Sequence, residues 1–210
     1  MTPADHIIFI VDDDFRVRES LQELLISAGF NVLAFGSAAA YLDCLKPDLS
    51  ACVLLDIELP DVNGLDLQQQ LAQGEHPPII FLTGHGDIPS SVRAMKGGAV
   101  DFLTKPFSEE QLLQAVRVAL EQHRQNRAEQ SELNSLKQRL ASLTPREREV
   151  LPLVASGLLN KQAAAYLGIS EVTLQIHRSK VMQKMAADSL ADLVRMAGRL
   201  NIPMTLTRHS

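Results

Sequence analysis

Carboxylate, hydroxyl and ammonium side chains follow short apolar runs in the first half of this 210-residue sequence. They are Asp12, Asp13, Asp14, Asp56, Thr83 and Lys105. Short continuous apolar runs are typical of strands buried on both faces, and in an open parallel sheet functional groups gather at the carboxyl ends of the strands. The spacing therefore predicts that these side chains meet at one edge of a sheet.

Several carboxylates at one edge favour a phosphoryl-transfer site that holds a divalent cation. Carboxylates so close together repel one another unless protons or a cation offset the charge. Mg²⁺ (or Mn²⁺) prefers oxygen ligands, and Mg²⁺ also binds phosphate oxygens. Asp56 can then act as a nucleophile toward phosphorus. The cation and Lys105 would neutralise charge on the transferred phosphoryl group.

An alternation of strand and helix patterns predicts the framework that would position these groups. Five apolar runs indicate strands at His6–Val11, Asn31–Phe35, Cys52–Leu55, Ile79–Leu82 and Phe102–Leu103. Each run is followed by a helical pattern, which predicts a doubly wound five-stranded parallel sheet in an α/β domain of about 120 residues. A long helical linker would then join this domain to a small all-α domain.

Residues 5–123 resemble the CheY-like receiver domain of bacterial two-component response regulators. The matching segments are Ile10-Val11-Asp12-Asp13-Asp14, Leu54-Leu55-Asp56-Ile57-Glu58-Leu59-Pro60 with Gly64 beyond, Thr83-Gly84-His85-Gly86-Asp87, and Lys105-Pro106-Phe107. The resemblance implies that Asp56 accepts phosphate. It also implies that Asp12, Asp13 and Asp56 hold Mg²⁺ together with the backbone carbonyl of Glu58.

The same resemblance implies that three further residues respond to the phosphoryl group. Thr83 and Phe102 would be the hydroxyl and the aromatic that rearrange on activation, and Lys105 would pair with the phosphoryl group. The family more often has Tyr at the position of Phe102, which lacks the hydroxyl. The peptide bond before Pro106 is typically cis in the family, which would direct Lys105 inward.

Each site residue also has a purely structural interpretation. The acidic residues 12–14 could cap a helix, Asp56 could begin a loop, Thr83 could be an ordinary strand residue and Lys105 a solvated surface lysine. All of these residues stand at four separate strand ends, and their joint match favours the phosphoacceptor site.

Two other classes of protein are alternatives to a phosphorylated regulator. A phosphatase of the haloacid-dehalogenase type carries Asp-x-Asp after its first core strand, whereas Asp56 follows the third expected strand and Glu58 stands two positions on. A receiver that never takes up phosphate would lack the acid pair, the Thr or the Lys, and all are present here. We therefore expect a regulator and not an enzyme.

The charge changes sign along the chain. Residues 1–123 contain 18 acidic and 7 basic residues, and residues 124–210 contain 7 acidic and 13 basic ones. A basic second part is a candidate for binding nucleic acid. It contains two helical patterns, Asn160–Leu167 and one from Glu171, joined by Gly168-Ile169-Ser170. This spacing is typical of a helix-turn-helix, although the pattern alone also fits a plain helical bundle.

Residues 138–203 resemble the LuxR/FixJ-type DNA-binding domain. The matching segments are Leu143-Thr144-Pro145-Arg146-Glu147-Arg148-Glu149-Val150-Leu151, Ser156-Gly157-Leu158-Leu159-Asn160-Lys161, Gly168–Leu174 and His177-Arg178. The resemblance implies base contacts from Gln175, Ile176 and Ser179. It implies phosphate contacts from Lys161, Thr173, Arg178 and Lys180. Leu174 and Gln175 replace the Val and Lys common in the family, so the base preference is open.

The two resemblances together predict a FixJ-type response regulator with three parts: a receiver at 5–123, a helical linker at 124–142 and a DNA-binding domain at 143–205. A histidine kinase would phosphorylate Asp56, and a face around Val92, Lys96 and Asp101 would then favour a homodimer. The expected partners are double-stranded promoter DNA and RNA polymerase.

Two further expectations concern the linker and the cell compartment. Leucines at 133, 136, 140 and 143 are spaced either for a short coiled coil or for one amphipathic helix packed on its own domain. The sequence has no secretory or membrane-spanning pattern, which predicts a soluble, cytoplasmic protein without a membrane partner.

Overall fold

The computed structural model describes residues 6–44, 49–84 and 87–203, so His85 and Gly86 lie outside the described residues. The chain divides into two compact units, residues 1–127 and 128–210, which are described separately. Strand and helix alternate through the first unit, and only helices follow in the described part of the second.

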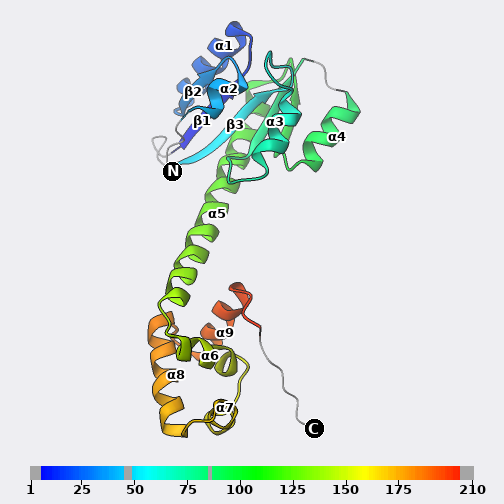
Figure 1. Ribbon diagram of the computed structural model, residues 1–210. Helices are drawn as coiled ribbons and strands as arrows, with labels where there is room; N and C mark the ends of the chain where they lie inside the picture. Colours follow the sequence, from blue (N-terminus) through cyan, green and yellow to red (C-terminus); the bar gives the residue numbers. More distant parts are fainter. Residues whose placement is uncertain (1–5, 45–48, 85–86, 204–210) are drawn as a thin grey trace. The chain divides into compact units, whose positions relative to one another are not determined.

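A five-stranded parallel sheet forms the centre of the first unit (Figure 1). Its strands are β1 (His6–Val11), β2 (Asn31–Phe35), β3 (Ser50–Asp56), β4 (Ile79–Thr83) and β5 (Asp101–Thr104). The spatial order is β2-β1-β3-β4-β5, and every neighbouring pair is parallel. This is the doubly wound order with its switch point between β1 and β3, and it confirms the predicted fold class.

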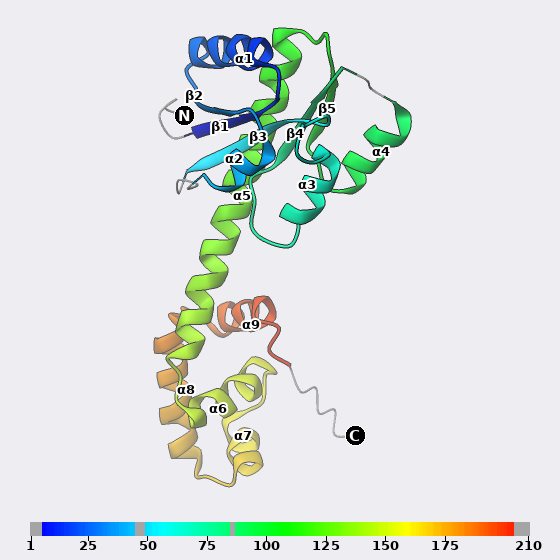
Figure 2. The ribbon, with the colours of Figure 1, turned by 45° about the horizontal axis from the view of Figure 1, so that its top comes forward.

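Two apolar cores lie on opposite faces of this sheet because alternate residues of each strand point to opposite sides. Phe9 and Val11 of β1 belong to the core that α2 (Ala38–Leu42), α3 (Gly64–Leu71) and α4 (Ile88–Lys96) cover. Ile8 and Ile10 belong to the core that α1 (Phe15–Ser27) and the first half of α5 (Glu109–Ala141) cover. Figure 2 shows the two helical layers on either side of the strands.

Polar side chains begin four of the five helices of this unit. Asp14, Ser37, Asn63 and Asp87 each accept a hydrogen bond from a backbone N–H in the first turn of α1, α2, α3 and α4 respectively. Such caps satisfy donors that a helix start leaves without a partner. The loops at the carboxyl ends of β1, β3 and β4 are therefore tied to the helices that follow them.

The second unit packs α6 (Pro145–Ala155), α7 (Asn160–Leu167), α8 (Glu171–Met185) and α9 (Leu190–Arg199) around one apolar core. Thr144 and Glu147 form a capping box at the start of α6. Leu143 is buried in this core and Leu140 packs against it. These two contacts are of the kind that a helix packed on its own domain would make.

A buried carboxylate joins two helices of the second unit. Glu147 of α6 is 2% exposed, accepts a hydrogen bond from the Thr144 backbone N–H and forms an ion pair with Lys184 of α8 at 2.7 Å. The hydrogen bond from Lys184 is the main reason that the pKa of Glu147 falls to about 2. Glu147 thus stays ionised, and the pair fixes the end of α8 against the start of α6.

No helix in the described part of the chain is long and apolar enough to cross a membrane.

A histidine joins α5 to the edge of the sheet opposite the acidic strand ends. The backbone N–H of Ala51, at the start of β3, donates to Nδ1 of His123 at 2.8 Å. This bond requires a neutral imidazole with its proton on Nε2. Burial lowers the pKa of His123, and the nearby Arg127 and His76 lower it further.

We predict that this histidine makes the stability of the first unit depend on pH. A lowered pKa means that the folded state binds fewer protons than the unfolded state, so the free energy of unfolding should fall as the pH drops below about 6.5. His123→Gln keeps an acceptor but cannot titrate, and urea unfolding at about pH 7.5 and 5.5 should show a smaller pH difference for this variant. His76→Gln is the control and should keep most of the wild-type difference. An unchanged pH dependence in His123→Gln would contradict this role.

Candidate functional site

The groups singled out at the strand ends come together at one edge of the sheet. Asp12 and Asp13 follow β1, Asp56 ends β3, Thr83 ends β4 and Lys105 follows β5. One carboxylate oxygen from each of Asp12, Asp13 and Asp56 lies within 4.8 Å of the other two. Asp12 and Asp56 are buried and Asp13 is exposed, so the cluster opens to solvent on the Asp13 side.

Lys105 reaches into this cluster from the end of β5, the last strand in the spatial order of the sheet. Its Nζ lies 2.6 Å from Oδ2 of Asp12 and 3.4 Å from Oδ2 of Asp56. Its backbone N–H donates to the carbonyl of Thr83 at 2.7 Å, and the peptide bond to Pro106 is cis, as expected from the resemblance. Burial lowers the pKa of Lys105, but the hydrogen bond to Asp12 and the charges of Asp12 and Asp56 outweigh burial and raise it overall.

The pKa of Asp56 lies above its ordinary value. Burial raises the pKa of Asp56 most, and the neighbouring charge of Asp12 adds to that effect. Lys105 and the backbone N–H of Ile57, which donates to Oδ1 at 2.8 Å, act in the opposite direction. Because burial wins, a further cation beside Asp56 would stabilise its ionised, nucleophilic form.

The donor set of the cluster fits a hard divalent cation. Carboxylate oxygens with access to water are the ligands that Mg²⁺ takes, and the three carboxylates supply them without a nitrogen or sulfur ligand. Glu58 lies in the loop after β3, where its side chain is exposed and its backbone forms an isolated bridge with Asn63.

The two expected switch residues differ in burial. Thr83 is 1% exposed at the end of β4. Phe102 is half-buried on β5, and its ring centroid lies 6.4 Å from that of Phe81. The ring of Phe102 packs against the core that α2, α3 and α4 cover.

The residues of the expected dimer face lie on α4 and β5. Val92 and Lys96 are exposed on α4, and the carboxylate of Asp101 accepts the backbone N–H of Phe102 at 2.8 Å. Exposed apolar side chains continue along the same helix at Ile88 and Met95. The structure thus gives α4 an apolar outer surface next to β5.

A glycine allows the loop after β3 to fold back on the cluster. The N–H of Gly64 donates to the carbonyl of Ile57 at 2.8 Å. A Cβ at this position would lie 2.3 Å from the carbonyl oxygen of Asp56 and 3.0 Å from Cα of Ile57. Backbone therefore occupies the space that any other side chain would need.

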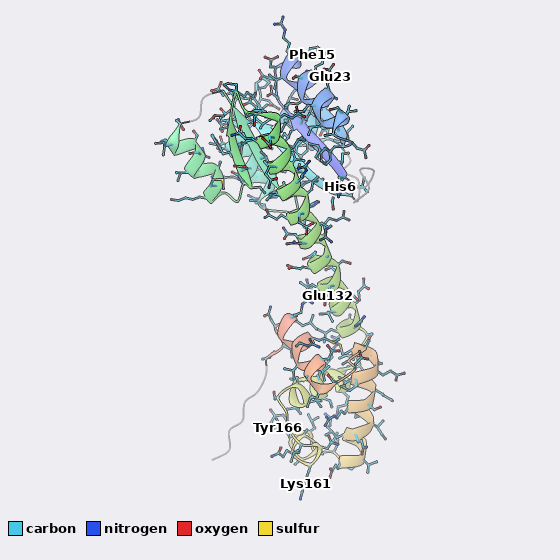
Figure 3. The ribbon with its side chains drawn as sticks, turned by 180° about the vertical axis from the view of Figure 1, so that it is seen from behind. His6, Phe15, Glu23, Glu132, Lys161 and Tyr166 are labelled. Carbon is cyan, nitrogen blue, oxygen red and sulfur yellow. The ribbon has the colours of Figure 1, made fainter. Side chains whose placement is uncertain are left out.

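The expected DNA-contacting residues lie on the helix-turn-helix of α7 and α8. Gly168 ends α7 in the left-handed conformation, φ 64°, and Ser170 caps α8. Most of the expected contacts are exposed, namely Lys161, Gln175, Ile176, Ser179 and Lys180. Figure 3 shows Lys161 and Tyr166 on α7 with their side chains directed outward.

Two of the expected contacts are held within the protein. Arg178 donates to Oδ1 of Asn160 at 2.8 Å, which joins α8 to the start of α7. The hydroxyl of Thr173 hydrogen-bonds that of Ser170 at 2.8 Å. Both side chains are half-buried, so Arg178 fixes the angle between the two helices in addition to any contact that it makes with DNA.

Sequence reasoning missed three features of these surfaces. Arg18 hydrogen-bonds the backbone of the acidic loop, Tyr166 is 67% exposed on α7, and Val172 is 69% exposed at the start of α8. Nothing in the sequence distinguishes Arg18 from its neighbour Arg16.

Comparison with known proteins identifies both units. The pattern of the response regulator receiver domain matches residues 8–117, and that of the bacterial regulatory proteins of the luxR family matches residues 141–197. Nodulation protein W of Bradyrhizobium diazoefficiens is 51% identical over 97% of this chain and 90% of its own. The transcriptional regulatory protein FixJ of Azorhizobium caulinodans is 44% identical over 93% of each chain. The solved structure of the response regulator StyR is 45% identical, with a TM-score of 0.83 over 93% of this chain and 99% of that one.

The Gly64 contact makes a testable prediction about the acidic cluster. Gly64→Ala forces the end of β3 to shift, which should lower the free energy of unfolding by about 1–3 kcal/mol. The shift should also weaken Mg²⁺ binding, since Asp56 belongs to the displaced backbone. Gly74→Ala is the matched control because nothing lies within 4 Å of a Cβ there. Calorimetric Mg²⁺ titration and urea unfolding of both variants check this, and equal behaviour of the two would contradict it.

Proposed function

This chain belongs to the bacterial response regulators that combine a receiver domain with a LuxR-family DNA-binding domain, and these proteins are transcriptional regulators and not enzymes. On that premise we propose that phosphorylation of Asp56 by a histidine kinase controls the binding of this protein to DNA. The observation that carries this proposal is the convergence of Asp12, Asp13, Asp56 and Lys105 at one edge of the sheet.

The chemistry of Asp56 supports its role as the phosphoacceptor. A carboxylate oxygen would form a bond to phosphorus while the phosphorus–nitrogen bond of a phosphohistidine breaks and the histidine leaves with the electron pair. Nζ of Lys105 lies 3.4 Å from Oδ2 of Asp56, so its ammonium can pair with the oxygens of a phosphoryl group on Asp56. The Asp12 carboxylate keeps this ammonium in place at 2.6 Å.

Mg²⁺, when bound by Asp12, Asp13, Asp56 and the Glu58 carbonyl, would neutralise phosphoryl charge. The chain's own contribution is to hold these oxygens in position. The backbone of Asp14 donates to the Asp12 carboxylate at 2.9 Å, and Asp14 in turn caps α1. Positioning and charge supply most of the acceleration in phosphoryl transfer, so a rigid set of oxygen ligands suffices.

Phosphorylation would reach the rest of the protein through Thr83 and Phe102. A phosphoryl group on Asp56 offers the buried Thr83 hydroxyl new acceptor oxygens. Movement of Thr83 would free space for the half-buried ring of Phe102 to turn inward. The outer surface of α4 and β5, around Val92, Lys96 and Asp101, would then change and favour a homodimer.

A homodimer would place two copies of α8 on two half-sites of double-stranded promoter DNA, about one helical turn or a multiple of it apart. Gln175, Ile176 and Ser179 would contact base edges, and Lys161, Thr173, Arg178 and Lys180 would contact phosphates. The receiver would comprise residues 5–123, the linker 124–142 and the DNA-binding domain 143–205. RNA polymerase is the expected further partner at the promoter.

The first prediction from this proposal concerns the phosphoacceptor. Asp56→Asn removes the nucleophilic oxygen while keeping the shape of the side chain, so a small phosphodonor with Mg²⁺ should label the wild type and leave the variant unlabelled. Asp66→Asn on α3 changes an exposed acid that pairs with Arg93 and is the control, which should label like the wild type. Phosphate incorporation is measured by mass spectrometry of the intact protein. Equal labelling of Asp56→Asn and wild type would refute the assignment.

The second prediction separates base contacts from phosphate contacts. Gln175→Ala should cost about 1–3 kcal/mol of discrimination at one base position and change the preferred sequence. Lys161→Ala should weaken binding to all sequences alike and reduce the slope of log affinity against log salt by about 1. Selection from random duplex DNA and binding titrations at several salt concentrations test both variants. A changed sequence preference in Lys161→Ala alone would contradict these roles.

A further inference from the structure

The β1–α1 loop carries two of the three carboxylates, and one arginine holds its backbone. Nη1 of Arg18 donates to the carbonyl of Asp12 at 2.7 Å and to the carbonyl of Asp13 at 2.9 Å. Both acceptors belong to the residues whose side chains enter the acidic cluster. A single guanidinium nitrogen thus joins the two successive peptide groups from which these carboxylates project.

The surroundings of Arg18 keep its guanidinium at these carbonyls. On one side the guanidinium lies 5.7 Å from the ring centroid of Phe15. On the other side lies Gly36, just after β2, where a Cβ would come within 3.4 Å of Nη1. Arg18 also lies in the helix that this loop begins, because its backbone N–H donates to the carbonyl of Asp14. The arginine therefore connects the loop, the first turn of α1 and the end of β2.

We propose that Arg18 is a positioning residue for the divalent cation site, which fixes the directions of the Asp12 and Asp13 carboxylates through their backbone carbonyls. This inference rests on the proposed function, since it assigns a residue to the same site. Rotation of either peptide would swing its carboxylate away from Asp56. Two charge-assisted hydrogen bonds oppose that rotation, and they do so without consuming a carboxylate oxygen that the cation needs.

A lysine could not replace this contact in full. The two N–H bonds of this guanidinium nitrogen lie in one plane and are fixed in direction, whereas an ammonium is a compact charge on a flexible stem. Arg18→Lys should therefore restore only part of the affinity for the cation. Partial restoration separates an effect of geometry from one of charge alone.

The test measures Mg²⁺ binding by calorimetry in the full-length protein, with the unfolding midpoint of each variant as a separate readout. Arg18→Ala should weaken Mg²⁺ binding by about tenfold or more, as losses of partners behind metal ligands do. Arg16→Ala is the matched control, because it removes the same charge from an exposed position two residues earlier on α1 and should bind Mg²⁺ within about twofold of the wild type. Gly36→Val leaves Arg18 in the sequence and crowds its guanidinium, so it should also weaken binding, and it serves where Arg18→Ala does not fold.

The outcomes distinguish this inference from the proposed function. Wild-type affinity in both Arg18→Ala and Gly36→Val would overturn the positioning role and leave the proposed function standing. An equal loss in Arg16→Ala and Arg18→Ala would overturn it as well, because the loss would then follow charge and not hydrogen bonding. A wild-type protein that binds no Mg²⁺ would overturn the proposed function and this inference with it. Weaker binding in Arg18→Ala and Gly36→Val, with partial rescue in Arg18→Lys and an unaffected Arg16→Ala, supports it.

Discussion

Repulsion among three carboxylates is the constraint on which the first unit of this protein depends. The oxygens of Asp12, Asp13 and Asp56 lie within 4.8 Å of one another, and two of these residues are buried. Such a cluster is costly in isolation, and the ammonium of Lys105 offsets part of the cost by its contacts with Asp12 and Asp56. Under the proposed function, a divalent cation would offset the remaining repulsion, and the cation and Lys105 together would then offset the charge of a phosphoryl group.

Hydrogen bonds to the backbone hold the loops that supply these carboxylates. The loop after β1 is held by Arg18, and the loop after β3 folds back through the bond from Gly64 to Ile57. The carboxylate of Asp61 accepts the backbone N–H groups of Ala38 and Ala39, which ties the same β3–α3 loop to the start of α2. Each loop that supplies an acidic group is therefore fixed at a second point, and the carboxylates cannot simply move apart.

The sequence predicted the strands well because fully buried parallel strands appear as continuous apolar runs. It missed the beginning of β3, since Ser50 and Ala51 extend the strand by pairing with His6 and Ile7, and a polar residue at a strand end has no apolar signal. The gathering of Asp12, Asp56, Thr83 and Lys105 followed from topology alone, because the carboxyl ends of parallel strands meet at one edge. The contact of Arg178 with Asn160 was not predictable, since it depends on the angle between α7 and α8.

Little buried apolar surface holds α4 in place. Ala94 is the only residue of α4, among those that the structure describes, that is buried, whereas Ile88, Val92 and Met95 are exposed. Two polar contacts with α3 add to this small apolar area: the buried amide of Gln68 donates to the carbonyl of Ala94, and the exposed Arg93 pairs with Asp66. Gln68 also packs closely over Gly97. Elements with little buried apolar surface rearrange at the lowest free energy.

The strands on either side of α4 in the sequence end in Thr83 and begin at Asp101, so the weakly held helix lies between the two strands that carry the proposed switch residues. Under the proposed function, a shift of the Thr83 hydroxyl toward a phosphoryl group would displace this weakly held helix and so change the surface that a second copy would meet.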